Sequence, residues 1–399
     1  MNKIRFIKSF FVAILFSFLC FFPKDLFAKE DSNLKRSEIT IDAIYRHYGI
    51  KGSSLLRETY PYDESNKVTY LADTDQAQKK NFCSYLWPYS GSLTAVSLLL
   101  ETTGKCKYKR LLTKKVIRGL EQYYDISRTP AAYASYIKTS ASDRFYDDNI
   151  WIGIDFTDLY LSTGTKKYLE KARTLWKFIE SGTDAVLGGG VYWCEQKKGG
   201  KNTCSNAPAA VYAFKLFEAT KDSSYFYQGL GLYNWTKNHL QDPEDGLYYD
   251  NINQTGRIDK AKYAYNSGQM LQAAALLYKL TGEKTYLEEA EQIAQSAYHR
   301  FFHETKDSQG NALRLLNKGN IWFSAVMFRG YIELYEQTKS AVYIKTFQQN
   351  MNYAWEHMRD ENGLFNTDWS GKEKDTSKWL LTQFAMVEMY TRLSRLEVN

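Results

Sequence analysis

The stretch LYLSTGTKKYLEKA, residues 159–172, decides the fold because close variants of it recur along the chain. Each variant ends an apolar run, turns through a threonine and small or polar residues, and resumes with an aromatic residue. The other copies are LLLETTGKCKYKRLL (98–112), LFEATKDSSYFYQGL (216–230), LYKLTGEKTYLEEA (277–290) and LYEQTKSAVYIKTF (334–347). The aligned threonines, Thr103, Thr163, Thr220, Thr281 and Thr338, are 60, 57, 61 and 57 residues apart. This regular spacing predicts a repeated helical hairpin.

The two helices of each predicted hairpin differ in composition. The first is apolar nearly all round, as in NAPAAVYAFKLFE (206–218), and is expected to be buried. The second is amphipathic and charged, as in YLEKARTLWKFIES (168–181), and is expected to form an outer layer. The predicted inner helices begin near Gly91, Asp148, Asn206, Asn266, Ser324 and Leu380.

Five outer helices follow the first five inner ones, and the early segment SEITIDAIYRHYG (37–49) can supply the sixth. Six inner and six outer helices predict an all-α (α/α)6 toroid. An open solenoid is the alternative, but it would leave the ends of the inner layer exposed, and no polar caps are evident.

The first 28 residues are predicted to be a secretory signal. Lys3, Arg5 and Lys8 precede a largely apolar run, and Leu26-Phe27-Ala28 resembles a cleavage site. Cleavage after Ala28 leaves one catalytic domain, residues 29–399, exported to a periplasm, a cell surface or the medium, without a stable membrane span. It lowers the net charge from +7 to +4, because four basic residues and one acidic residue are removed. The small remaining charge, without a long unbroken basic run, argues against nucleic-acid binding. A lipid on Cys20 is an alternative that the large preceding residue disfavours.

Four cysteines follow the predicted signal. Cys194 and Cys204 flank a Gly/Lys loop and are plausible disulfide partners, which leaves Cys83 with Cys106. Four reduced thiols are the equally open alternative. No CxxC pair occurs, so a zinc site is not expected.

The long connections from outer to inner helices are expected to meet at one rim of the toroid. They hold aromatic, amide and acidic residues, which is the composition of a ligand-binding cleft. These segments are YLWPYSG (85–91), RFYDDN (144–149), GGGVYWC (188–194), EDGLYYDN (244–251), YAYNSG (263–268) and NGLFNTDW (362–369).

Asp147 and Asp148 stand side by side where the second inner helix begins. One aspartate suffices to cap a helix. Two carboxyls in an aromatic, half-buried position disfavour joint ionisation, so one is expected to hold a proton while the other stays charged. An acid beside a base or nucleophile is what glycoside hydrolysis requires. From spacing alone, capping and catalysis remain equally open.

From about Tyr85 onward the chain resembles glycoside hydrolase family 76, the endo-α-1,6-mannanase family. The resemblance rests on YDDNxW at 146–151, GGGVYW at 188–193, KNTCSNAP at 201–208 and YNSG at 265–268, in matching order and spacing. It implies an (α/α)6 toroid that cleaves α-mannan or mannooligosaccharides with retention of configuration. It further implies that Asp147 is the nucleophile and Asp148 the general acid/base. A transglycosylase, an unsaturated uronyl hydrolase with Lys197, Lys198 or Lys201 as carboxylate ligands, and a non-catalytic glycan-binding protein remain alternatives.

Several other residues at the rim are candidate substrate ligands. Trp87, Tyr192, Trp193 and Tyr265 can stack on sugar faces or pack between loops, and Trp151 belongs to the same aspartate motif. Asn149, Asn206 and Asn266 stand at inner-helix starts, where capping is their expected role and hydroxyl binding a further one.

No metal or cofactor is expected. His299 and His303 lack an HExxH pattern, and Asp242, Glu244, Asp245 and Asp250 lack EF-hand spacing. The pair Asp147-Asp148 also lacks the further aspartate of a diphosphate-binding motif, because Trp151 takes that position. We expect a monomer.

Overall fold

The computed structural model describes residues 24–65, 67–72, 80–307 and 309–396. Residues 1–23 of the predicted signal, including Cys20, therefore lie outside the described residues. The first described helix, α1 (Lys24–Tyr48), includes the predicted cleavage position. Within the described parts of the chain, no helix is long and apolar enough to cross a membrane.

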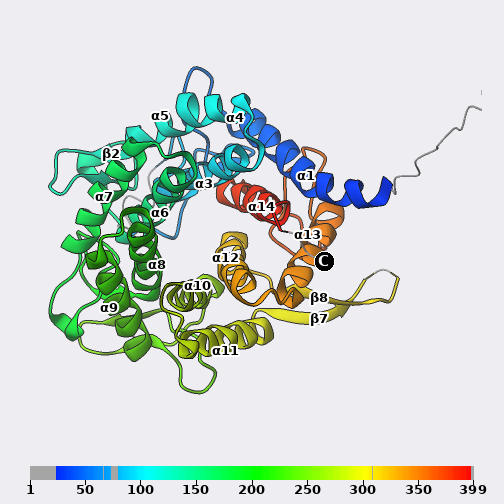
Figure 1. Ribbon diagram of the computed structural model, residues 1–399. Helices are drawn as coiled ribbons and strands as arrows, with labels where there is room; N and C mark the ends of the chain where they lie inside the picture. Colours follow the sequence, from blue (N-terminus) through cyan, green and yellow to red (C-terminus); the bar gives the residue numbers. More distant parts are fainter. Residues whose placement is uncertain (1–23, 66, 73–79, 308, 397–399) are drawn as a thin grey trace, which may run out of the picture.

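The described helices form two concentric rings (Figure 1). The inner ring consists of α3 (Leu86–Thr103), α6 (Tyr146–Thr163), α8 (Thr203–Thr220), α10 (Ala264–Thr281), α12 (Ile321–Thr338) and α14 (Leu380–Leu393). The outer ring consists of α1, α4 (Cys106–Leu111) with α5 (Ile117–Leu120), α7 (Lys166–Ser181), α9 (Ser223–Leu240), α11 (Lys284–Arg300) and α13 (Val342–His357). A π-helical turn, Leu112–Val116, joins α4 to α5. The predicted toroid is confirmed.

The ring closes through its first and last helices. Each inner helix packs against the next, and α14 packs against both α3 and α1. The hydroxyls of Ser37 and Thr391 are 2.6 Å apart, and the amide of Asn33 on α1 donates to Gln348 on α13 over 2.7 Å. The early segment therefore supplies the sixth outer helix, and the open-solenoid alternative is wrong.

The repeated threonine shapes the turn from each inner helix to the next outer helix. The hydroxyl of Thr163 donates to the carbonyl of Leu159 over 2.5 Å and accepts from the N–H of Thr165 over 3.3 Å. The other four threonines make the same two bonds. The residue after each threonine is left-handed: Gly104, Gly164, Lys221, Gly282 and Lys339, with φ of 62°, 66°, 60°, 75° and 56°. The repeat is thus a helix-terminating turn used five times.

Most inner helices begin earlier than predicted. The first begins at Leu86 instead of near Gly91. Pro88, which suggests a later start, is compatible with the first turn because the N–H it lacks would have no partner there. The next four inner helices begin two or three residues before their predicted positions, at Tyr146, Thr203, Ala264 and Ile321.

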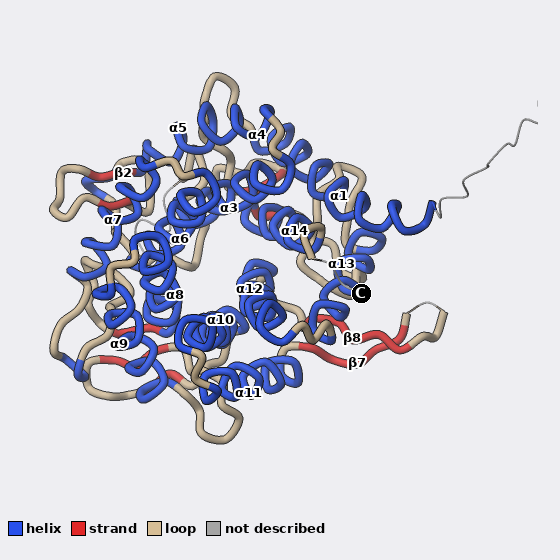
Figure 2. The backbone as a smooth tube through the Cα atoms, viewed as in Figure 1, coloured by secondary structure: helices blue, strands red, loops and turns tan. Residues whose placement is uncertain are grey.

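Short antiparallel strands occupy the long connections from outer to inner helices (Figure 2). β1 (Thr59–Tyr60) pairs with β9 (Lys378–Trp379), with Thr59 opposite Trp379. The others are β2 (Tyr124–Asp125) with β3 (Ala132–Tyr133), β4 (Gly200–Asn202) with β5 (Asn251–Asn253) and β6 (Ile258–Asp259), and β7 (Phe302–Lys306) with β8 (Ala312–Leu316).

The four cysteines among the described residues are all free thiols. Cys106 is exposed, whereas Cys83, Cys194 and Cys204 are buried. The predicted disulfides, Cys194–Cys204 and Cys83–Cys106, are therefore wrong, and the reduced alternative is the observed one. Cys204 instead contacts Asp147, and Cys194 contacts Gln196.

Candidate active site

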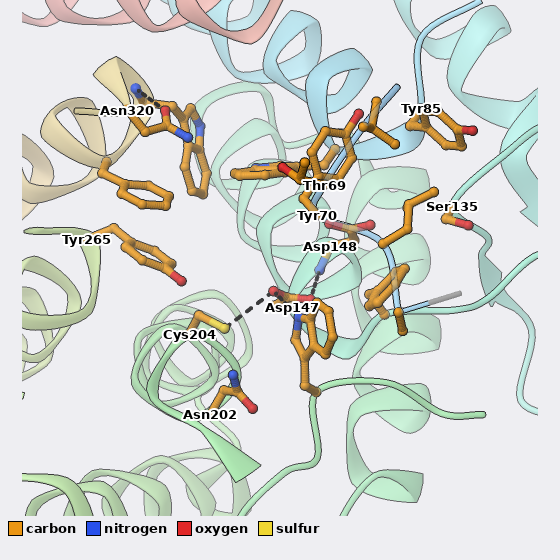
Figure 3. Close-up of a pocket in the computed structure, with 18 of the residues that line it drawn as sticks. Thr69, Tyr70, Tyr85, Ser135, Asp147, Asp148, Asn202, Cys204, Tyr265 and Asn320 are labelled. Atoms are coloured by element: carbon orange, nitrogen blue, oxygen red, sulfur yellow. Dashed lines mark hydrogen bonds between the residues drawn. The ribbon is translucent and has the colours of Figure 1, made fainter. Parts of the chain in front are cut away.

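A cleft of about 1020 Å³ opens at the rim where the long connections gather. Its walls come from the starts of α3, α6, α8, α10, α12 and α14 and from residues 58–59 and 67–72. Asp147 and Asp148 line it together with aromatic and amide side chains (Figure 3). The predicted convergence of the long connections holds for most segments. The segment 362–369 does not reach the cleft, because Leu364, Phe365 and Trp369 pack into the core.

Asp147 and Asp148 occupy the first turn of α6 in different environments. Oδ1 of Asp147 accepts the backbone N–H of Asp148 over 3.0 Å. Oδ2 accepts the indole N–H of Trp193 over 3.1 Å and the thiol of Cys204 over 3.4 Å. Asp148 is 8% exposed and faces the same cleft. One carboxyl is thus held by three donors, and its neighbour is buried beside it.

These different environments give the two carboxyls different pKa values. Burial raises the pKa of Asp147 above its ordinary value, because it outweighs the bonds from Cys204, the Asp148 N–H and Trp193, which lower it. Burial raises the pKa of Asp148 well above its ordinary value, and the neighbouring charge of Asp147 raises it further. The positive end of the α6 dipole favours one ionised carboxylate. The pair is therefore arranged to share one proton, with Asp148 as its holder.

Aromatic rings cover much of the cleft wall. Trp87 contacts Trp322 and Trp379 edge-on, with centroid distances of 5.4 and 5.2 Å. Trp151 meets Trp322 edge-on at 5.1 Å beside the carboxyl pair. Tyr265 stacks on Phe323 with centroids 4.0 Å apart and planes 13° apart. Such a surface presents apolar faces with a few polar tips, which suits the faces of sugar rings.

Four of the predicted substrate ligands line the cleft: Trp87, Trp151, Trp193 and Tyr265. Tyr192 does not. It is 1% exposed, and its hydroxyl donates to Asp184 over 2.8 Å behind the wall. In the motif GGGVYW, Trp193 therefore lines the cleft, whereas its neighbour Tyr192 packs behind the wall.

The three predicted asparagines are not helix caps, because the N-caps of their helices are Phe145, Asn202 and Tyr263. Asn149 is fully buried. Its amide binds both the N–H and the carbonyl of Tyr133, at 2.7 and 2.9 Å. Asn206 binds the N–H and the carbonyl of Val191 in the same way.

These side chains fasten rim loops to inner helices and do not line the cleft. Asn266 also lies behind the wall, where it donates to Asp250 over 3.3 Å.

Several cleft residues were not predicted from the sequence. Glu58 and Tyr70 come from the long first connection, and Trp322 and Trp379 lie at the starts of later inner helices. Trp322 lies as far before the repeated threonine Thr338 as Asp147 lies before Thr163. This equivalent position in the repeat could have predicted that Trp322 faces the cleft. Glu58 has no comparable signal, because its partners are remote in sequence.

Asp250 is a further carboxyl in the cleft, besides Asp147, Asp148 and Glu58. Burial raises its pKa, whereas the amides of Asn251 and Asn266 lower it. The sequence placed it in the predicted rim segment 244–251, and the structure puts it on the cleft wall.

No cluster of three metal-ligating side chains occurs among the described residues. Asp242 and Asp245 instead surround the ammonium of Lys262, at 2.5 and 2.8 Å. The ring of His303 lies within hydrogen-bond distance of the Asn317 side chain, at 2.8 Å, on the exposed β7–β8 hairpin.

Comparisons with known proteins agree with this geometry. The family model described as glycosyl hydrolase family 76 matches residues 58–397. A family 76 mannosidase from Bacteroides thetaiotaomicron is 32% identical to this chain, with a TM-score of 0.82. The alignment covers 91% of this chain and 98% of the mannosidase chain. An α-1,6-mannanase from Salegentibacter sp. is 25% identical, with a TM-score of 0.73, covering 92% and 100%.

An inactive variant of the Salegentibacter mannanase, with two consecutive aspartates replaced by asparagine, was solved with α-1,6-mannotriose. At 23% identity, covering 92% of this chain and 100% of its own with a TM-score of 0.71, it supports the fold. A comparison with curated proteins finds no match. The toroid, the paired aspartates in the cleft and the match over residues 58–397 together show that this chain belongs to glycoside hydrolase family 76.

Proposed function

We propose that this glycoside hydrolase is an endo-acting α-1,6-mannanase that retains anomeric configuration. The observation that carries the proposal is the pair Asp147 and Asp148, two consecutive carboxyls on one cleft. Asp147 is half-buried and accepts three hydrogen bonds, and Asp148 is buried beside it. The Bacteroides relative is described as a mannosidase and the Salegentibacter relative as an α-1,6-mannanase, which supports the choice of substrate.

The two carboxyls divide the reaction as follows. Asp147, whose ionised form its three donors favour, attacks the anomeric carbon while Asp148 gives its proton to the departing glycosidic oxygen. A covalent glycosyl ester on Asp147 results. Asp148, now ionised, takes a proton from water, whose oxygen attacks the anomeric carbon and releases Asp147. Consecutive positions favour the short carboxyl separation of retaining enzymes, about 5 to 5.5 Å.

The cleft walls supply the groups that hold a mannan chain. Trp87, Trp151, Trp193 and Tyr265 present ring faces and edges to sugars. Asn202 lies on the opposite side of the aspartate pair from Tyr70 (Figure 3), and Asp250 also lines the cleft, so both add hydrogen-bonding groups. A mixture of this kind binds a neutral polyol without needing a cation.

The direct experiment is incubation of the protein with unbranched α-1,6-mannan. We expect mannooligosaccharides to appear with wild type, and their release to fall at least about 10³-fold with Asp147→Ala, since loss of a nucleophile removes the covalent route. Wild type without products, or Asp147→Ala with undiminished release, would contradict the proposal.

Two finer features need their own measurements. Proton NMR of the first product should show the α-anomer before mutarotation, because double displacement retains configuration. Internal cleavage should shorten long chains early, before small products dominate. Longer oligosaccharides than those supplied would indicate transglycosylation, the alternative in which a sugar captures the intermediate.

The uronyl hydrolase alternative loses support from the positions of its lysines. Lys201 is buried and donates to Asp184 over 2.7 Å. Lys197 lines the cleft, but its ammonium donates to the carbonyl of Ala72. Lys198 lies over the ring of Tyr192, outside the cleft. A thermal-shift comparison of mannose and uronate oligomers distinguishes the two substrate classes.

A glycan-binding protein without catalytic activity is the other alternative. In that case both the wild-type protein and the Asp148→Asn variant would bind mannan, and neither would cleave it.

We further propose that the protein is exported after cleavage behind Ala28 and acts as a monomer. The basic start and apolar run of residues 1–28 support export. N-terminal sequencing of the secreted form and light scattering of the purified enzyme test the two statements.

A further inference from the structure

Glu58 is a buried carboxyl of the cleft wall that the proposed reaction does not use. It is 2% exposed and lies immediately before β1. None of the ion pairs formed by the described lysines and arginines involves it. Burying a carboxylate without a cation is costly unless hydrogen bonds compensate for the lost water.

Three donors converge on this carboxyl from three distant parts of the chain. Oε1 accepts the hydroxyl of Tyr70 and the indole N–H of Trp379, each over 2.6 Å. Oε2 accepts the backbone N–H of Tyr85 over 2.9 Å. Tyr85 is the N-cap of α3, and Trp379 is the N-cap of α14. Glu58 therefore connects segment 67–72 to the starts of two inner helices.

The two side chains that Glu58 binds, Tyr70 and Trp379, form part of the cleft surface. Tyr70 and Trp379 both line the cleft, and their rings lie 5.6 Å apart. Each also contacts Trp87 edge-on, at 5.2 Å. Tyr70 is close enough to Asp148 for that carboxyl to raise its pKa, after the larger effects of burial and Glu58 (Figure 3). The position of Tyr70 therefore sets the shape of the wall next to the proposed general acid.

Segment 67–72 also makes other contacts with the described parts of the chain, besides the bond to Glu58 and the ring contacts of Tyr70. It contains no helix or strand. Val68 and Leu71 join a small apolar cluster with Tyr85 and Phe145, and the carbonyl of Ala72 accepts from Lys197. These contacts hold the segment near the cleft, and within the described residues the bond to Glu58 is what fixes the hydroxyl end of the Tyr70 ring.

We propose that Glu58 is a positioning residue whose carboxylate holds Tyr70 and Trp379 as one glycan-contacting wall of the cleft. The inference rests on the proposed function, since the wall is assigned to a bound mannan chain. A carboxylate suits this role because it only accepts hydrogen bonds, and all three partners only donate to it. A glutamine would turn an N–H group toward one of those donors.

The test compares Glu58→Gln with wild type in the full chain. We expect KM for α-1,6-mannotetraose to rise about tenfold while kcat stays within about twofold, because ground-state and transition-state contacts with the wall are lost together. Tyr70→Phe, which keeps the ring and removes only the hydroxyl, should raise KM in the same direction by a smaller factor. Glu121→Gln is the matched control, because Glu121 also accepts a tyrosine hydroxyl, from Tyr133 over 2.8 Å, but lies outside the cleft.

Unchanged KM in Glu58→Gln and Tyr70→Phe would overturn the inference, as would a fall in kcat alone. If Glu58→Gln does not fold by circular dichroism, Tyr70→Phe decides the matter. Calorimetric binding of mannotetraose, measured in an Asp148→Asn background, keeps this test separate from the proposed function. Wild type that binds but never cleaves would remove the hydrolase proposal, while weaker binding with Glu58→Gln would still support the positioning role.

Discussion

The thiol of Cys204, on α8, donates a hydrogen bond across the cleft floor to Oδ2 of Asp147 on α6, with a separation of 3.4 Å. Burial raises the pKa of this thiol well above its ordinary value, so it keeps its proton and acts as a donor. Its bond lowers the pKa of Asp147 against the opposing effect of burial. A cysteine that the sequence suggested as a disulfide partner is thus a neighbour of the proposed nucleophile.

Replacing this thiol should therefore change the pH dependence of the reaction. In Cys204→Ala the ionised form of Asp147 loses one donor, so its pKa rises and the nucleophile becomes protonated at a higher pH. We expect the acidic limb of the kcat/KM profile to move upward by about one pH unit, the equivalent of one modest hydrogen bond. Activity at the alkaline side of the optimum should change little.

Cys204→Ser is the matched control, because a hydroxyl donates in place of the thiol. Its acidic limb should stay at or below that of wild type. Identical profiles for the alanine and wild-type enzymes would show that the thiol does not influence Asp147.

Asp148→Asn should remove the alkaline limb, because the pKa of Asp148 is raised above its ordinary value by burial and by Asp147, and loss of its proton ends general-acid catalysis. Turnover of α-1,6-mannan should fall about 10²- to 10⁴-fold. A dinitrophenyl glycoside, whose leaving group needs no proton, should still form the glycosyl-enzyme at a rate near that of wild type. With Asp148→Ala, added azide should yield an α-mannosyl azide. Equal losses on both substrates would mean that Asp148 is not the acid.

The fold could be predicted because its information is local. Each turn is built from a threonine hydroxyl and a left-handed residue within a few positions, so the repeat shows directly in the sequence. The aspartate pair was visible for the same reason, since Asp147 and Asp148 are adjacent.

Contacts made by ring closure could not be predicted in this way. Glu58 and Trp379 meet only because the last inner helix returns to the first connection, 321 residues away along the chain. The asparagines were misassigned for a related reason. A helix-start asparagine predicts a cap, but Asn149 and Asn206 bind the backbone of loops 16 and 15 residues before them.

Asp250→Asn should weaken substrate binding more than it slows the reaction. The carboxylate of Asp250 lines the cleft, and Asn251 and Asn266 hold it through amide donors. A hydrogen bond to a charged carboxylate contributes about 1.5 to 3 kcal/mol, against about 0.5 to 1.5 kcal/mol for a bond to a neutral amide. We expect KM for mannotetraose to rise about fivefold with kcat lowered less, as measured by initial rates. Asp259→Asn, on the neighbouring strand outside the cleft, serves as control.

Lys221→Gly and Lys339→Gly should each stabilise the fold. Both lysines occupy the left-handed position that glycine holds in the other three turns, with φ of 60° and 56°. A side chain in this region costs about 1 kcal/mol, partly offset by the greater unfolded-state freedom of glycine. Urea denaturation should show a gain of up to about 1 kcal/mol for each variant. The reverse change, Gly164→Ala at φ 66°, should lower stability, and a gain there would contradict the account.

Arg329→Met should destabilise the protein far more than removal of a surface ion pair. Arg329 is 6% exposed and binds both carboxylate oxygens of Glu388, over 2.7 and 2.9 Å, between α12 and α14. Its guanidinium also lies 5.7 Å from the ring of Trp151, at the cleft floor. Removing Arg329 leaves the buried Glu388 paired with Arg392 alone, at 2.8 Å. We therefore expect a loss of about 3 kcal/mol, the lower end of the range for a broken buried pair.

Arg395→Met is the control, because its pair with Glu101 is partly exposed and should contribute less than about 1 kcal/mol. The free energy of unfolding from urea titrations measures both variants. A double variant, Arg329→Met with Glu388→Met, should recover part of the loss because the buried carboxylate is also removed, and the Arg392 that it leaves unpaired is partly exposed. If the single and double variants lost equal stability, the buried charge would not be the cause, and lost packing around the toroid axis would explain the effect.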